Sequence, residues 1–515
     1  MKALLMIMLL AAAAKPDHGF EKAILILSGA SCMEDLDEST LERYRTLAAH
    51  PVDLNAAGRS RLLSCGLFNA FQVASLLEYR QNTGDVLSYT ELSLVDGFPS
   101  ETVEALRLFT VLETSGPPGK RHGSRVHNDL MLRASARSGS TAAGGFKYKL
   151  SAGERAELGW GSRITYSDRT LRPGTVSAAL YGRRHLGKLV LGHFNARFGQ
   201  GLALWSGFSV SPYSSVSSLV RSGTGISTTA SFDPQFCGAA ADFDFGRWNA
   251  GCGYSVKGNM PFATVSYTSR TFTAGALATN DAASAFWRAG FPNLSFFGEL
   301  AWKGGAAASC GLLWVPSYGR KAAVLCRYGE GAAEALAGIG TASLDAVAAI
   351  SRSQQRVTVK WSPRTGKESL TLTPSLRFAA RRTDVLRLEG RGELQLDAGA
   401  WMVRSRLDVV HCSSYSWLFN AEAGHTQGAL RAWLRWTLFR VEDWPDRIYV
   451  YERDAPGNFN VPAYYGKGWS ISAYGAWKPS RRHALYLRLS YIAYPWNLTE
   501  KPERAEVKLQ YQLSL

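Results

Sequence analysis

The 515-residue sequence lacks any long uninterrupted run of apolar residues beyond its first few positions. A membrane-spanning helix needs about 18 or more such residues. If this protein crosses a membrane, it therefore has to cross it as a closed β-barrel. The early run from Ala3 to Ala14, behind Met1 and Lys2, is too short to span and ends in small residues. This layout predicts a secretory signal peptide at residues 1–14.

Paired cysteines and catalytic motifs are missing as well. The seven cysteines are widely scattered, with no CxxC pair and no histidines at ligand spacing, so we expect no metal site and mostly buried thiols. Lipidation of Cys32, at the end of the apolar stretch from Lys22, is an open alternative. The histidines, such as His127 and His411, stand singly, and no GxSxG, HExxH or phosphate-loop motif occurs. We predict no cofactor and no enzymatic activity.

Lysine is absent from residues 34–114, where thirteen acidic residues face six arginines and the net charge is −7. Residues 115–515 carry 49 basic and 27 acidic residues, a net charge of +22. This division predicts two domains of opposite charge with separate roles. The stretch between them, residues 114–125, is rich in Gly, Pro and cations and is typical of a linker.

The acidic domain, residues 34–113, has the periodicity of helices. Asn69 to Gln72 opens a longer helix with an apolar face, and Ser88 to Glu91 has the spacing of a capping box. The turn at Asp96 to Pro99 leads into a last helix with Val103, Leu106 and Phe109. The predicted order is helix, hairpin, helix, connector, helix, hairpin, helix, which is two copies of one unit.

From residue 126 onward the periodicity is two, and it continues to the end of the chain. Apolar and polar residues alternate at 386–396, 430–438, 485–491 and 504–515. The apolar face of the last strand includes Leu509, Tyr511, Leu513 and Leu515. Charges at every second position suit a watery lumen better than a packed core. We predict an antiparallel transmembrane barrel of roughly 20 strands in outer-membrane lipid. A soluble sandwich or solenoid is the alternative.

Three stretches resemble the helix-hairpin-helix outer-membrane proteins of Bacteroidetes-type bacteria. They are PVDLNAAGRSRLLSCGLFNAFQVASLLEYRQNTGDVLSYTELSLVDGF, GHFNARFGQGLALWSGFS (192–209) and IYVYERDAPGNFNVPAYYGKGW (448–469). The resemblance implies a small all-α helix-hairpin-helix module ahead of a large β-barrel. It also implies an outer-membrane location with the N-terminal module in the periplasm.

More distantly, the module is similar to periplasmic DNA receptors of the competence type. In that family a Gly-apolar-Gly hairpin directs backbone N–H groups at a DNA phosphate. The corresponding positions here are Gly66, Leu67 and Phe68, and Gly97, Phe98 and Pro99. Phe68 adds a side chain where the phosphate needs close approach, and Pro99 has no N–H to donate. Because the module is also acidic, we predict that these hairpins contact a protein partner rather than nucleic acid.

Two segments of the barrel region are candidate sites. Gly199, Gln200, Gly201 and Trp205 suit a pore constriction or an inward loop, or else a simple turn with an apolar face. The Ser- and Gly-rich stretch after them, residues 206–227, suits a plug or a long loop. The segment 449–465 mixes aromatic residues with charged ones, as carbohydrate and peptide sites do, although an interfacial belt has the same composition.

A row of arginines on the polar faces of the strands predicts a preference for anionic solutes, unless they pair with neighbours such as Glu389, Glu393 and Asp408. These arginines are Arg387, Arg391, Arg404, Arg406, Arg431 and Arg435. The function that we expect is passage or assembly at the outer membrane, with the helical module docking a periplasmic protein. DNA uptake is the alternative, and a barrel hydrolase is a third hypothesis.

Overall fold

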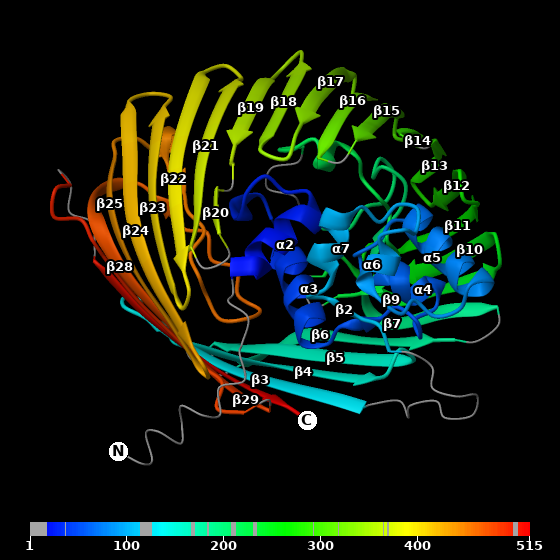
Figure 1. Ribbon diagram of the computed structural model, residues 1–515, viewed down its shortest axis with the longest axis horizontal. Coiled ribbons are helices and arrows are strands. Elements are labelled where there is room, and N and C mark those ends of the chain that lie inside the picture. The colour runs from blue at the N-terminus through cyan, green and yellow to red at the C-terminus, as the bar shows by residue number, and fades with distance from the viewer. Residues whose placement is uncertain are drawn as a thin grey trace.

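The chain forms a large closed barrel around a group of helices (Figure 1). The computed structural model describes residues 18–36, 38–113, 126–165, 170–182, 185–207, 213–229, 234–291, 293–317, 319–363, 365–367, 370–480, 482–497 and 503–515. Within these residues 24 long antiparallel strands form the barrel, and β30 closes it by pairing with β3. The predicted fold class is confirmed, with a barrel larger than the roughly 20 strands expected. The predicted signal peptide and linker lie outside the described residues.

The barrel strands follow one another around the wall in chain order. They are β3 (Val126–Arg137), β4 (Ala143–Ala152), β5 (Ala156–Thr165), β6 (Thr170–Tyr181), β7 (Leu186–Arg197), β9 (Phe236–Phe245), β10 (Trp248–Ser255), β11 (Met260–Thr268), β12 (Phe272–Thr279), β13 (Ala282–Phe291), β14 (Leu294–Lys303), β15 (Ala306–Ser317), β16 (Arg320–Gly329), β17 (Ala332–Gly340), β18 (Leu344–Ser351), β19 (Gln355–Trp361), β21 (Leu370–Arg382), β22 (Leu386–Ala398), β23 (Trp401–His411), β24 (Tyr415–Gln427), β25 (Leu430–Val441), β28 (Gly466–Trp477), β29 (His483–Ala493) and β30 (Arg504–Ser514). The short strands β8 (Gly225–Thr228) and β20 (Thr365–Lys367) pair with β7 and β21.

Side chains alternate between an apolar exterior and a polar interior, as the sequence predicts. On β30, Val507 and Leu509 are exposed on the outside, whereas Lys508 reaches inward to Asp454. Exposed aromatic residues mark both ends of the strands. They include Trp248, Trp361, Trp401 and Trp477 at one end and Tyr254, Trp302, Tyr328 and Tyr415 at the other. A closed sheet leaves no strand edge unpaired, and an apolar belt between aromatic girdles suits lipid.

The exterior also corrects one expectation about the cysteines. Cys65 is buried, but Cys252, Cys310 and Cys326 are exposed on outward-facing strand positions. These thiols lie on the apolar outer face of the wall, a surface that a soluble protein would have covered. No helix in the described part of the chain is long and apolar enough to cross a membrane.

The two rims of the barrel differ. One rim, here called the terminal rim, carries the start of β3 and the end of β30 and is otherwise built of short turns. The other, the loop rim, carries two long connections, residues 198–235 between β7 and β9 and residues 442–465 between β25 and β28. The second connection, residues 442–465, is called the inner loop below. It contains η3 (Trp444–Asp446) and the hairpin of β26 (Ile448–Tyr449) with β27 (Ala463–Tyr464).

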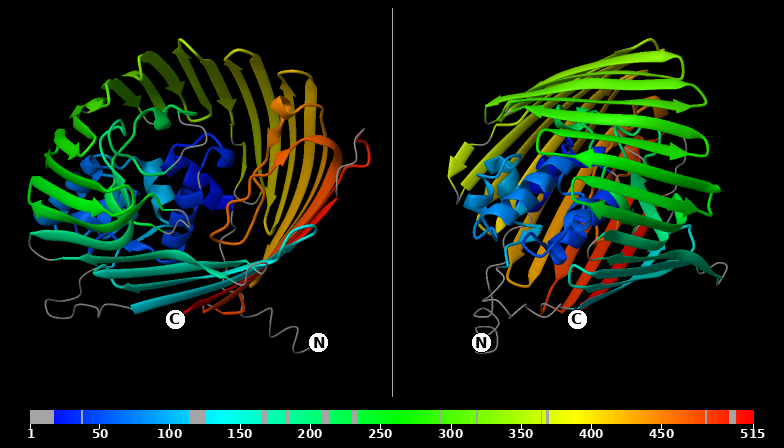
Figure 2. Two further views of the ribbon diagram at one scale, coloured as in Figure 1. Left: turned by 180° about the vertical axis from the view of Figure 1, so that it is seen from behind. Right: turned by 90° about the vertical axis from the view of Figure 1, so that its right-hand side faces the viewer.

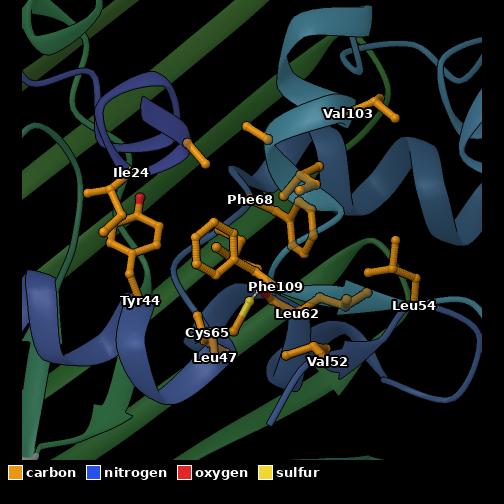
Figure 3. Close-up of a cluster of buried hydrophobic side chains, with 14 of the residues drawn as sticks. Ile24, Tyr44, Leu47, Val52, Leu54, Leu62, Cys65, Phe68, Val103 and Phe109 are labelled. Atoms are coloured by element: carbon orange, nitrogen blue, oxygen red, sulfur yellow. Dashed lines mark hydrogen bonds between the residues drawn. The ribbon is translucent and has the colours of Figure 1, made fainter. Parts of the chain in front are cut away.

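The helical module lies inside the barrel, towards one end of it (Figures 1 and 2). Its elements are α2 (His18–Ser28), η1 (Met33–Asp35), α3 (Glu38–Ala49), α4 (Arg59–Ser64), α5 (Ala70–Asn82), α6 (Tyr89–Leu92) and α7 (Ser100–Leu106), with β1 (Val52–Asp53) paired in parallel to β2 (Thr110–Val111). Helix α2 precedes the boundary expected at residue 34, yet its Ala23 and Ile24 belong to the same core as Tyr44 and Phe109 (Figure 3).

The predicted caps define the helix pairs α4–α5 and α6–α7. Asn69 and Gln72 form a capping box at the start of α5, and the Ser88 hydroxyl accepts the N–H of Glu91 at α6. Asn55 joins the two pairs, because its side chain both accepts the N–H of Val86 and donates to the Val86 carbonyl. The module is therefore one folded unit rather than two independent pairs.

Candidate functional site

The contact between helical module and barrel wall consists largely of ion pairs. Glu21 on α2 lies 3.0 Å from Arg404 on β23 and 2.7 Å from Arg453 of the inner loop. Glu34 on η1 pairs with Arg391 on β22, at 3.3 Å, and with Arg406 on β23. The acidic domain and the basic domain thus meet face to face, which gives a structural reason for their opposite charges.

The same complementarity continues on the opposite side of the module. Glu42 on α3 lies 2.5 Å from Lys147 on β4, and His50 contacts Asp129 on β3. Arg61 on α4 reverses the polarity, because it bridges Glu154 and Glu157 at 2.6 and 2.5 Å. Buried charges are costly unless they are paired, so these pairs fix the module in one orientation.

Burial on its own would raise the pKa of the Glu34 carboxyl. The nearby guanidiniums of Arg391 and Arg406, and a hydrogen bond from the N–H of Tyr451, instead hold that pKa well below its usual range. The pKa of Glu21 is likewise lowered, because Arg453 and Arg404 outweigh its burial. Both carboxyls therefore stay ionised and keep their attraction to the wall at neutral pH.

The three apolar side chains at the predicted hairpin positions face the interior of the module, whereas Gly97 and Pro99 are exposed. Leu67, Phe68 and Phe98 are buried, and the Phe68 and Phe98 rings lie 5.9 Å apart between centroids. Gly66 has a φ of 70°, and a Cβ there would lie 2.6 Å from Arg43 Nη1. A guanidinium thus occupies the space next to the glycine. Gly97, with a φ of 90°, accepts a hydrogen bond from Gln72, and Pro99 caps α7.

An inward loop at Gly199, Gln200 and Gly201 is anchored to strand β14 of the wall. The positive φ of Gly199 and Gly201 turns the backbone so that the N–H groups of Gln200 and Leu202 donate to Glu299 Oε2, at 2.7 and 3.1 Å. Glu299 on β14 is fully buried. A Cβ at Gly199 would lie 2.7 Å from this carboxylate, so only glycine allows the contact.

Trp205 lies in a ladder of alternating cations and rings near the loop rim. The guanidiniums of Arg197 and Arg221 lie 5.8 and 5.4 Å from its ring, and Arg221 and Arg327 lie 5.0 and 5.2 Å from the ring of Tyr213. This ladder ties the described part of the 198–235 connection to the wall. In the same part of the connection, Val216 and Leu219 pack against Phe297 and Leu336 of the wall.

The segment 449–465 belongs to the inner loop, and its polar residues face partners within the protein. Glu452 contacts Arg488 and Tyr464, and Asp454 lies 2.8 Å from Lys508. The Asn458 side-chain oxygen accepts a hydrogen bond from Arg133, and the Asn458 backbone carbonyl accepts one from Arg45 on α3. Tyr451 is part of the helical module's core, whereas Tyr449 and Tyr465 are exposed. The inner loop therefore contacts the module from the side of the loop rim.

Most arginines of the predicted row form ion pairs within the protein. Arg391, Arg404 and Arg406 hold the module, Arg435 pairs with Glu422, and Arg387 pairs with Glu389 at 2.6 Å. Arg431 lines a cavity of about 970 Å³ beside the module. Among the described residues, no group of three or more His, Cys, Asp or Glu is placed to hold a metal ion.

Sequence reasoning missed the acidic partners of this network. Glu21 and Glu34 stand in segments without a recognisable motif, and only the opposite charges of the two domains signal that they have partners. Glu299 carries a stronger signal, because it is a lone carboxylate in the otherwise apolar strand segment SFFGELAW. A carboxylate at an inward position of an apolar strand needs a buried donor.

Comparisons with known proteins give low similarity throughout. The sequence matches no known family profile and no curated protein. OccAB3 of Acinetobacter baumannii is 10% identical with a TM-score of 0.33, over 76% of this chain and 99% of its own. The P pilus usher (PapC) translocation pore is 10% identical with a TM-score of 0.38, over 76% and 99%. OccK11 (OpdR) of Pseudomonas aeruginosa is 9% identical with a TM-score of 0.33, over 76% and 96%.

The strand pairing and the ion pairs themselves define the class of the molecule. It is a closed 24-stranded antiparallel β-barrel, in the described residues, with a helical module held inside its lumen.

Proposed function

We propose that the protein is a non-enzymatic outer-membrane barrel whose helical module controls passage through the lumen. The observation that carries this proposal is the acidic module inside a basic wall, held by Glu21, Glu34 and Glu42. A barrel of this size without an internal domain would enclose a wide aqueous channel. A domain attached by ion pairs, which weaken when either partner is neutralised or competed for, is a reasonable gate.

The asymmetry of the rims supports an orientation. Outer-membrane barrels have short turns on the periplasmic side and longer loops outside the cell. By that rule the terminal rim faces the periplasm. The module contacts this rim through Arg59, which donates to the Gly246 carbonyl at 3.0 Å, and through Asp96, which pairs with Arg270. The proposal therefore refines the expected periplasmic location: the module lies within the lumen at its periplasmic mouth.

A disulfide between module and wall tests the gating role directly. A Cβ built at Gly187 on β7 would lie 3.4 Å from Ser60 Cβ on α4, close to the separation in native disulfides. We expect the oxidised Ser60→Cys/Gly187→Cys protein to show low conductance in planar bilayers. After reduction, voltage or denaturant pulses should open large conductance steps. Equal conductance in both redox states would contradict gating by the module.

This test needs a background without the facing cysteine pair of the wall, and a matched control. Cys310 and Cys326 lie directly opposite each other on β15 and β16, and both are exposed on the outer face. They are to be replaced by Ser in the test protein. The same pair left in place, with Ser60 and Gly187 unchanged, is the control, because a disulfide there joins two wall strands without touching the module.

A second part of the proposal is that the module docks a periplasmic protein. Leu87 and Leu94, on either side of α6, are 70% and 80% exposed, next to Asp96 at the terminal rim. Glu101 and Glu104 add negative charge on the neighbouring helix α7. An exposed apolar pair within an acidic surface suits a partner with apolar and basic residues. Copurification from gently solubilised outer membranes should yield a companion that Leu87→Asp/Leu94→Asp loses.

DNA uptake is the competing function. The acidic charge of the module, the Arg43 guanidinium against Gly66 and the missing N–H of Pro99 favour the protein partner instead. A gel-shift assay with the full-length protein in detergent separates the two. Salt-sensitive binding of duplex DNA at low micromolar protein, lost on Gly66→Trp, would favour DNA uptake.

A further inference from the structure

A cavity of about 970 Å³ lies between the helical module and one side of the barrel wall. The module contributes residues of α2, η1, α3 and α4, the wall contributes mainly β3 to β7 and β28 to β30, and the inner loop contributes the rest. Lys478, Arg482 and Ser514 bring the lining to the terminal rim, while Pro456 and Gly457 of the inner loop bound it on the opposite side. The cavity is therefore a vestibule at the terminal rim, alongside the module.

The charges of this lining are unequal. Ten Lys and Arg side chains line the cavity against five Asp and Glu side chains and the C-terminal residue Leu515. Four of the five carboxylates pair with a lysine or an arginine: Glu21 with Arg404, Glu42 with Lys147, Glu157 with Arg61 and Asp454 with Lys508. The fifth, Asp129, contacts His50. Most of the acidic lining is thus already paired within the protein.

Three of the cations form no such close ion pair. In the part of the chain that the structure describes, Arg43, Lys149 and Arg482 lie within 4 Å of no carboxylate side chain, although Lys149 attracts Asp129 and Glu157 from a longer distance. The Arg43 Nε atom is buried without a hydrogen-bond partner, and the guanidinium lies 5.5 Å from the Tyr44 ring. A buried donor without an acceptor is a place where a ligand gains a hydrogen bond that the protein alone lacks.

The remaining lining is polar and aromatic. Hydroxyl and amide groups line the wall at Thr175, Ser177 and Asn195, and the rings of Tyr148 and Tyr486 face the same space. Such a lining recognises a polar organic molecule rather than an apolar one. The chemistry that complements it is a compact organic molecule with several negative charges.

We propose that this vestibule binds small organic polyanions at Arg43, Lys149 and Arg482. The inference rests on the proposed function in that the vestibule is the entrance to the gated lumen. It differs from the sequence expectation, which assigned anion preference to the arginine row. Arginines of that row pair with Glu21, Glu34 and Glu422. The cations Arg43, Lys149 and Arg482 line the cavity on the other side of the module.

Binding of a fluorescent polyanion tests the proposal on the full-length protein in detergent. The probe is 8-hydroxypyrene-1,3,6-trisulfonate, and the readout is its fluorescence anisotropy. We expect saturable, salt-sensitive binding, with about a tenfold loss of affinity in Arg482→Glu and in Lys149→Gln, because a charge-assisted hydrogen bond is among the stronger polar contacts. Combining the two substitutions should abolish detectable binding.

Arg352→Glu is the matched control. Arg352 is exposed in the turn between β18 and β19 at the loop rim, and it does not line the cavity. The proposal is overturned if Arg352→Glu weakens binding as much as Arg482→Glu does, or if neither lining variant weakens it. Heat-modifiable gel mobility shows that each variant keeps its barrel. Unequal conductance of the locked and reduced Ser60→Cys/Gly187→Cys protein, with no probe binding, would remove this inference and leave the proposed gate standing.

Discussion

Glu21 of helix α2 and Arg453 of the inner loop lie 2.7 Å apart, although 432 positions separate them in the chain. Arg453 also contacts Glu422 on β24 at 2.9 Å, so one guanidinium links the module, the inner loop and the wall. The burial of Arg453 would lower its pKa, but Glu21 and Glu422 raise that pKa instead. This shared cation is why the helical module and the loop from the opposite rim behave as one assembly.

Replacing Glu34 should loosen the module more than any exposed acidic substitution. Glu34→Gln leaves Arg391 and Arg406 with Asp408 as their remaining carboxylate. Removing one partner of a buried ion pair typically costs about 3–5 kcal/mol. Trypsin should then cleave the module at its arginines, which mass spectrometry of the peptides detects. Glu104→Gln is the control, because Glu104 is 73% exposed and pairs with Arg107 three positions along the chain.

The attachment of the module should resist mild acid. The folded-state pKa of Glu34 is held well below its ordinary value of about 4.3. A lowered folded-state pKa contributes stability that is fully present above the ordinary value and is lost as the pH falls through the folded-state value. Bilayer conductance should therefore stay low from pH 8 to pH 5 and rise only in stronger acid. A rise between pH 8 and pH 5 would contradict attachment through Glu34.

Alternation along the strands was sufficient to predict the barrel, its polar interior and the outward face of β30. The interior arrangement was not predictable in the same way, because it depends on contacts between residues hundreds of positions apart. Glu34 meets Arg406 only after both the helices and the barrel have formed. The opposite charges of the domains were visible in the sequence, but they equally fit two separate bodies, and only the structure shows that they neutralise each other.

At the hairpin positions, the structure bears on the expected obstruction by Phe68 and does not bear on which partner the module binds. Phe68 was expected to obstruct a phosphate, and it lies in the module's core against Phe98. Phe68→Ala should cost about 3–5 kcal/mol in the stability of the module. Hydrogen exchange of the full-length protein should show faster exchange in α4 and α5, with the barrel strands unchanged. Leu94→Ala, at an 80% exposed side chain, should leave exchange as it is.

Glu299 offers the sharpest test of the inward loop. Its carboxylate accepts the N–H groups of Gln200 and Leu202, and hydrogen bonds to a charged acceptor contribute about 1.5–3 kcal/mol each. Glu299→Ala removes both contacts and leaves two backbone donors without an acceptor. We expect residues 198–205 to become accessible to proteases and the single-channel current to become noisier. Glu299→Gln keeps one acceptor oxygen and the same shape, so it should fall between the wild type and Glu299→Ala. If the alanine variant kept the loop fully protected, the anchor would have to be sought in the Trp205 and Arg221 stacking instead.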